Sequence, residues 1–239
     1  MLKFLLGSVI LSLITLTLVG GVLGFIPGIS TLMGAAPKDL GQRITSEDSL
    51  AAQSKTGIEV AKLPKDTLDD KGYSPEGKKA LSVTYDSKEV TALVNNLTWK
   101  NFPAKNVQIK INPDGSIESS GVIIISKAIP FAEGLGYSAD QVKQAMEKYR
   151  LPKFEVPYYL KGNGNIKNNN VTLSVSSFKI GAIPVPQNIT NNAAFEAVSF
   201  IENLINRYQD HYSAESLIFD NGKVAFTGQV PEKINVVAD

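Results

Sequence analysis

The hydrophobic and polar positions divide the chain into an apolar N-terminal run, a polar segment and a long region of mixed pattern. The run Phe4–Ile26 contains twenty-three residues and no charge. A helix of that length would measure roughly 34 Å at about 1.5 Å per residue, which exceeds the roughly 30 Å hydrocarbon core of a bilayer. We therefore predict a transmembrane signal-anchor over residues 1–30, a polar tether over 31–79 and an α+β domain over 80–239.

The residues that flank the run bear on its orientation and processing. Basic residues are nearly balanced, with Lys3 before the run and Lys38 and Arg43 after it. A very short tail followed by a large domain favours export of the domain, which predicts a single-pass protein of the cell membrane with an extracytoplasmic C-terminal domain. Cleavage near Ala36 is the alternative, because small residues precede it.

One short helix is expected inside the polar tether, over Ser46–Lys55. Thr45 can cap it, Asp48 stands three residues on, and Gly57 can end it. The rest of the tether is rich in Lys, Asp, Gly and Pro, a composition typical of a linker.

The domain contains an internal similarity at an offset of 107 residues. Ile111–Ile123 aligns without a gap with Ile218–Val230, and both segments read as strand, Asp/Asn-Gly turn and strand. Gly121 and Gly228 stand in the second strand of each, where a missing side chain indicates a bulge or a close backbone approach. The same offset superimposes two apolar helix faces, the first being Val90, Leu93, Val94 and Leu97 and the second Ala197, Phe200, Ile201 and Leu204. We predict a helix followed by a hairpin, occurring twice, by internal duplication or because two such units look alike.

Further elements are expected between the two units. The pattern predicts a helix over Ser138–Tyr149, a strand over Glu155–Lys161, a turn over Gly162–Asn165 and a strand over Asn170–Ile180. One face of the last strand should carry Val171, Leu173, Val175 and Ser177. The expected fold is α+β, with antiparallel hairpins packed on two or three helices.

Composition removes several classes of function. Without Lys3 the chain has 23 basic and 23 acidic residues, whereas a nucleic-acid-binding protein normally has a basic surplus. The chain has no cysteine and a single histidine, His211, so Cys-based and paired-His metal sites are excluded. No nucleophile or phosphate-loop motif is present. We therefore predict no enzymatic activity, no cofactor, no metal and no nucleic-acid partner.

The apolar helix faces and the nearby aromatic residues are the candidates for ligand binding. They could line a groove between helix and sheet, and ordinary core packing is the alternative reading. The candidate residues are Val90, Val94, Leu97, Trp99, Phe102, Ile201, Leu204 and Ile205.

Two segments also carry a family resemblance. The strand-to-helix segment Leu81–Asn95 and the closing hairpin Asp220–Gly228, behind an N-terminal anchor, resemble small membrane-anchored extracytoplasmic bacterial proteins of the YpmS and YceB sort. Some of these resemble tubular lipid-binding domains, in which a curved antiparallel sheet wraps a long helix around an apolar channel. The resemblance covers roughly residues 80–232 and implies no catalytic residue. This chain departs from it in lacking a lipid-modified cysteine and in its Pro37–Lys79 segment.

Two functions remain open from the sequence. The first is a membrane-anchored binding module that holds a lipid or other amphiphile in an apolar groove between helix and sheet. The second is a non-enzymatic structural or interaction protein of the cell envelope, with a filled core and an envelope protein or cell-wall polymer as partner.

Overall fold

The structure is a computed structural model that describes residues 36–64, 73–96, 102–127, 130, 131, 133, 140 and 155–237. The predicted signal-anchor lies outside these residues, as does the predicted helix Ser138–Tyr149 apart from residue 140. Among the helices that are described, none combines the length and the apolar character needed to cross a membrane.

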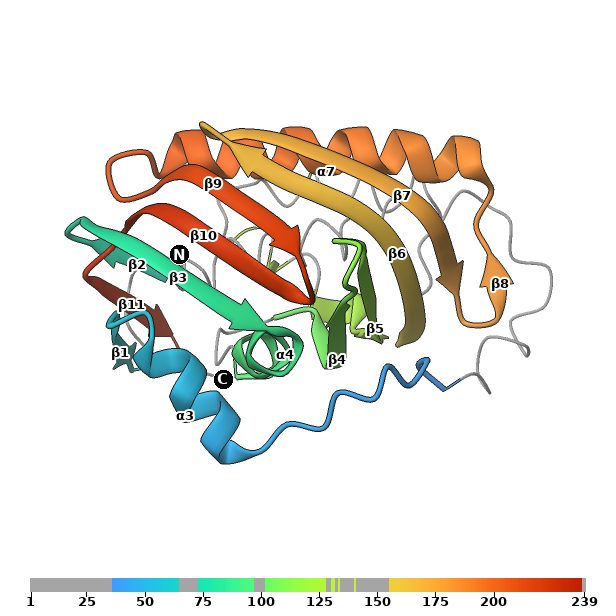
Figure 1. The fold of residues 1–239 in the computed structure, drawn as a ribbon, viewed down its shortest axis with the longest axis horizontal. Coiled ribbons are helices and arrows are strands. Elements are labelled where there is room, and N and C mark those ends of the chain that lie inside the picture. Colours follow the sequence, from blue (N-terminus) through green and yellow to red (C-terminus); the bar gives the residue numbers. More distant parts are fainter. Residues whose placement is uncertain are drawn as a thin grey trace.

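The described elements confirm the α+β class (Figure 1). Its helices are α3 (Ser46–Ser54), α4 (Ser87–Asn95) and α7 (Gln187–Arg207), with a 3-10 turn at Ile125–Lys127. The strands are β1 (Glu59–Leu63), β2 (Tyr73–Glu76), β3 (Lys79–Asp86), β4 (Ala104–Ile111), β5 (Ile117–Ile123), β6 (Val156–Lys167), β7 (Asn170–Ile180), β8 (Ile183–Pro184), β9 (Ser213–Asp220), β10 (Lys223–Val230) and β11 (Lys233–Val237).

Most of the described strands form one antiparallel sheet, which contains eight of them. Its order is β3-β10-β9-β6-β5-β4, and β7 pairs with β6 and with β8. A smaller sheet has the order β1-β11-β2, in which β1 and β11 run parallel. The buried apolar residues of both sheets and of the helices form one cluster, whose largest fully buried side chains are Tyr85, Tyr158, Tyr212 and Phe226.

The long strand β6 connects the two halves of the large sheet. It pairs with β7 along one edge, while the other edge pairs first with β5, up to Gly162, and then with β9, from Ile166. The turn predicted over Gly162–Asn165 is therefore wrong, since these residues continue the strand. The chain reverses at Asn168 and Asn169 instead, both of which have positive φ angles, a conformation that asparagine tolerates better than most residues.

A β-bulge in β7 corrects a second expectation. The register between β6 and β7 shifts between Lys161 and Gly162, which leaves Ser176 as the extra residue of β7. Val175 and Phe178 are both buried on the inner side, while Ser177 is half-buried on the outer side. The predicted inner face is thus correct up to Val175 and wrong at Ser177.

The helix followed by a hairpin does occur twice, as α4 with β4–β5 and as α7 with β9–β10. Both glycines stand at bulges as predicted: a Cβ on Gly121 would lie 3.1 Å from the Cα of Val107, and one on Gly228 would lie 2.2 Å from the oxygen of Ser213. The registers differ, however. Ile111 pairs with Ile117, whereas Ile218 pairs with Ala225 and not with the equivalent Val224. Internal duplication remains a prediction.

Helix α3 forms as the tether sequence predicts. The side chain of Thr45 accepts a hydrogen bond from the backbone of Asp48, and the Asp48 carboxylate accepts one from the backbone of Thr45. This reciprocal capping box satisfies two N–H groups that a helix start leaves without partners. Tyr85 of β3 donates to the carbonyl of Ala52, which fixes the helix against the large sheet.

Helix α4 covers the free edge of β4 through its side chains. Ser87, Thr91 and Asn95 follow each other at intervals of four residues and accept hydrogen bonds from the backbone N–H groups of Ile111, Ile109 and Val107, at 2.9, 2.9 and 3.0 Å. Thr91 and Asn95 also donate to the carbonyls of Ile109 and Val107. Four residues of a helix rise about 6.0 Å and two residues of a strand about 6.6 Å. The spacing of these side chains along α4 therefore matches the spacing of the N–H groups along β4. We call these three side chains the α4 rail.

The α4 rail predicts a specific cost for losing one hydroxyl. Thr91→Val removes the partner of two buried backbone groups of Ile109 while keeping the size of the side chain. Each unsatisfied buried group costs roughly 1–3 kcal/mol, so we expect the unfolding free energy to fall by at least about 2 kcal/mol. Urea unfolding of the full chain in detergent, followed by circular dichroism, measures this change.

The matched control is Thr84→Val, on an exposed position of β3, where the change should stay within about 0.5 kcal/mol. Equal unfolding midpoints for the two variants would show that the rail contributes nothing.

Candidate functional site

An open hollow of about 570 Å³ lies between α4, β4 and the residues that precede α3. This volume is within the roughly 300–1,000 Å³ range of small-molecule sites. Apolar residues form part of its lining: Ile44, Val94, Phe102, Ala104, Val107 and Ile124. Polar residues form the rest, and they include Gln42, Asn95, Lys105, Asn106, Gln108 and Lys127.

The shape of the hollow depends on a bulge in β4. The register with β5 shifts between Lys105 and Gln108, and Asn106 in this bulge has a φ of 52°. A non-glycine residue in this region costs energy and is common at functional sites. The bulge turns Asn106 toward solvent at the wall of the hollow, while Val107 remains buried.

An aromatic pair and an ion pair stand beside the hollow. The ring of Phe102 packs edge-on against Phe131, with centroids 5.8 Å apart. Lys105 Nζ lies 2.6 Å from a carboxylate oxygen of Glu155. Both charged groups are about half exposed, so this pair contributes little to stability and leaves the lysine free to exchange partners.

A strap of residues 36–44 crosses the outer face of β4 and β5 and supplies one wall of the hollow (Figure 1). Gln108 of β4 holds it, because its Oε1 accepts hydrogen bonds from the backbone N–H groups of both Leu40 and Gln42, at 2.9 and 3.1 Å. Leu40 is buried. The described part of the predicted tether therefore packs on the domain.

Glu118 of β5 binds the start of the strap. Its carboxylate accepts hydrogen bonds from Tyr159 Oη at 2.7 Å, Lys38 Nζ at 2.9 Å and Asn112 Nδ2 at 3.3 Å. Lys38 Nζ also lies 3.9 Å from the centre of the Tyr159 ring, a cation–π distance. Burial alone would raise the pKa of Glu118, but these hydrogen bonds and the charge of Lys38 outweigh it and lower the pKa to about 2.

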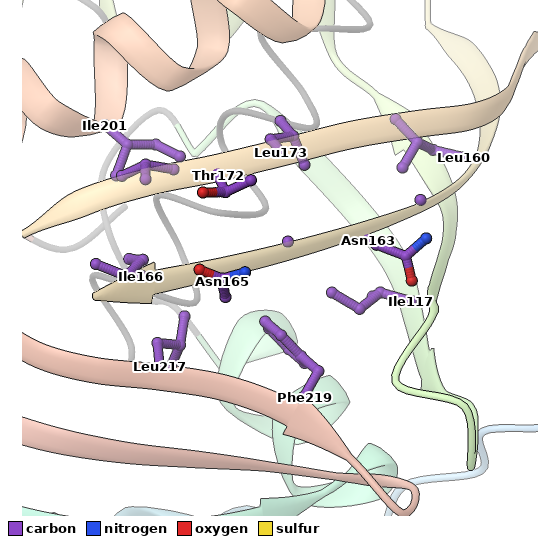
Figure 2. A pocket seen from close by; sticks show the side chains of 13 residues that line it. Ile117, Leu160, Asn163, Asn165, Ile166, Thr172, Leu173, Ile201, Leu217 and Phe219 are labelled. Carbon is purple, nitrogen blue, oxygen red and sulfur yellow. The ribbon is translucent and has the colours of Figure 1, made fainter.

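A second, smaller cavity lies where β5 and β9 separate along β6 (Figure 2). The tips of the two hairpins meet there, since Asn221 and Gly222 donate backbone hydrogen bonds to the carbonyls of Pro113 and Asn112. Apolar side chains line the cavity, among them Ile117, Leu160, Ile166, Leu173, Ile201 and Phe219. Its volume of about 20 Å³ has room for about one water molecule.

All of the predicted ligand-binding residues that the structure describes belong to the buried core cluster, and three of them also border a cavity. Val94 and Phe102 line the open hollow, and Ile201 lines the small cavity. Val90, Leu204 and Ile205 are buried in the common core. Leu97 and Trp99 lie outside the described residues.

Sequence reasoning missed the polar part of the hollow. Asn95 gave no signal of a site, because it directly follows an apolar helix face. Asn106 and Gln108 gave none, because they occur in an ordinary strand pattern. The single signal was Gly121, which predicts a bulge on the opposite strand. Within the described ranges, no group of three acidic or histidine residues could hold a metal ion.

Comparison with family models, with curated proteins and with solved structures gave no match.

The Glu118 cluster predicts a pH dependence of stability. The folded pKa of about 2 lies below the ordinary glutamate value of 4.5, so the contribution of Glu118 is fully present above about pH 4.5 and is lost as the pH falls toward 2. Glu118→Gln should lower the unfolding free energy by about 2 kcal/mol at pH 7 and flatten its decline below pH 4.5. Urea unfolding at a series of pH values measures both effects.

Glu155→Gln is the control, because its ion pair with Lys105 is about half exposed and is worth at most about 1 kcal/mol. If both variants follow the pH profile of the original chain, the Glu118 cluster does not hold the strap.

Proposed function

We propose that this chain is a membrane-anchored, extracytoplasmic binding module without catalytic activity, which holds a lipid or other amphiphile between helix and sheet. The observation that carries the proposal is the open hollow between α4 and β4, with an apolar lining beside amide and lysine groups. An amphiphile needs both kinds of surface. Val94 and Phe102, predicted as ligand-binding residues from sequence, belong to this lining.

Because the hollow is open, its affinity for an amphiphile in free solution is low. Burial of about eight methylene groups would contribute roughly 6 kcal/mol, at about 0.8 kcal/mol each. Association alone costs at least about 4 kcal/mol. A site with so little net affinity fills only where its ligand is concentrated, as lipids are beside a bilayer. The predicted anchor and the hollow therefore support the same function.

A second function is favoured by the interior of the described part. Val90, Leu204 and Ile205 pack within the common core, and the apolar cavity beside Ile201 has room for about one water molecule. These features agree with an interaction protein of the cell envelope that has a filled core and contacts an envelope protein or cell-wall polymer through its surface.

A photoreactive phospholipid distinguishes the two functions. With the full chain reconstituted in vesicles that contain this lipid, illumination should attach it to peptides that include residues 102–108 or 124–127. Ile124→Trp places a larger side chain in the hollow, and we expect it to reduce this crosslinking about tenfold or more, equivalent to about 1.4 kcal/mol of binding.

Ile218→Trp is the matched control, because Ile218 is 53 % exposed on the outer side of β9. It should leave the crosslinking unchanged. Crosslinks confined to residues 1–30, or equal in both variants, would refute the lipid site and leave the interaction protein as the better explanation.

A further inference from the structure

The outer face of the β4–β7 half of the large sheet carries a surplus of lysines. Paired residues on neighbouring strands project to the same side, so the registers define which side chains share this face. The rows are Lys110, Glu118, Lys161 and Ser177; then Gln108, Ser120, Tyr159 and Lys179; then Lys105, Val122 and Pro157. We call these residues the lysine face. Its β5 residues Glu118, Ser120 and Val122 are buried, whereas Lys110 and Lys179 are exposed and Lys161 is half-buried.

Ion pairs neutralise some of the charged residues of the lysine face but not all of its lysines. Lys105 pairs with Glu155, and Glu118 pairs with Lys38 of the strap. Lys110, Lys161 and Lys179 form no ion pair with any other residue that the structure describes. The three lysines therefore leave a charge of +3 on this face. The charge is +2 when Asp114 of the adjoining turn is counted.

The other half of the same sheet differs. On the outer side of β3, β10 and β9, the charged row consists of Asp86, Lys223 and Asp220, and the remaining rows are uncharged. The formal charge there is −1. The near-zero charge of the whole chain thus conceals an uneven distribution over one continuous sheet.

The strap enters the domain over the lysine face. Lys38 lies on the ring of Tyr159, in the second row of that face. Seven residues, 31–37, separate it from the end of the predicted signal-anchor, and at 3.3–3.6 Å each they reach at most about 25 Å. A domain suspended at this face presents the strap and the neighbouring exposed lysines to the bilayer.

From this geometry we propose that the accessible lysines of the lysine face form a docking surface for anionic phospholipid headgroups, which holds the domain against the membrane with the strap and these lysines facing the lipid. The proposal rests on the membrane anchor of the proposed function. Its physical basis is the attraction between basic side chains and a negatively charged membrane surface within a Debye length, about 8 Å at physiological salt. The opening of the hollow, which includes Lys105 and Gln108, lies at the margin of this face, where a lipid could leave the bilayer.

The chain contains no cysteine, so single cysteines can report which face approaches the lipid. Ser177→Cys reports from the lysine face, and Ala225→Cys reports from the outer side of β10 as a matched position. The full chain is reconstituted in phosphatidylcholine vesicles with or without phosphatidylglycerol and labelled with a membrane-impermeant fluorescent maleimide. A nitroxide on the lipid headgroup then quenches each label according to its proximity.

In vesicles with phosphatidylglycerol, we expect quenching of the label at position 177 to exceed that at position 225 at least about twofold. The excess should disappear in phosphatidylcholine alone, at about 1 M salt, where the Debye length is about 3 Å, and in the Lys161→Gln/Lys179→Gln double variant. Lys223→Gln should preserve it.

Equal quenching at the two positions, with the protein bound to the vesicles, would overturn the lysine-face proposal and leave the proposed function intact. A chain that does not float with the vesicles would refute the anchor itself, and both proposals with it.

Discussion

The α4 rail is the interaction on which the arrangement of the described domain depends. An edge strand exposes backbone groups that invite pairing with other chains, and β4 is such a strand at the end of the large sheet. Ser87, Thr91 and Asn95 occupy those groups with side chains instead of another strand. Because α4 directly follows β3, at the opposite end of the same order, the rail brings the two ends of the sheet to one helix (Figure 1).

The features that the sequence predicted correctly are those that short-range chemistry determines. The capping box of Thr45 and Asp48 depends on four consecutive residues. Gly121 and Gly228 indicated bulges because each lacks a side chain within a strand. A side chain at Gly228 would collide with the neighbouring strand, and one at Gly121 would make a tight contact with it. The second turn, at Asn221 and Gly222, needs two positive φ angles, which that residue pair supplies.

The errors arose where a distant strand decides the local conformation. Gly162–Asn165 has the composition of a turn, but pairing with β7 holds it extended. The Ser176 bulge moved Ser177 away from the inner face without any signal in β7 itself. The same limit applies to the candidate site. Val94 could be predicted because it lies on an apolar helix face. Gln108 could not, because its role depends on the strap, which binds it from 66 and 68 residues earlier in the chain.

Strand β4 contacts three parts of the molecule: the α4 rail, the core and the strap. Its position therefore links these three parts. Its edge binds the α4 rail, its inner side contributes Val107, Ile109 and Ile111 to the core, and its outer side binds the strap through Gln108. The bulge at Asn106 allows these roles to coexist, because the extra residue reaches the hollow without disturbing the pairs on either side. A molecule in the hollow would contact Val94 of the helix, Asn106 of the bulge and Gln42 of the strap. Since the strap leads toward the predicted anchor, occupancy of the hollow and the position of the domain relative to the membrane would be linked through one short segment of chain.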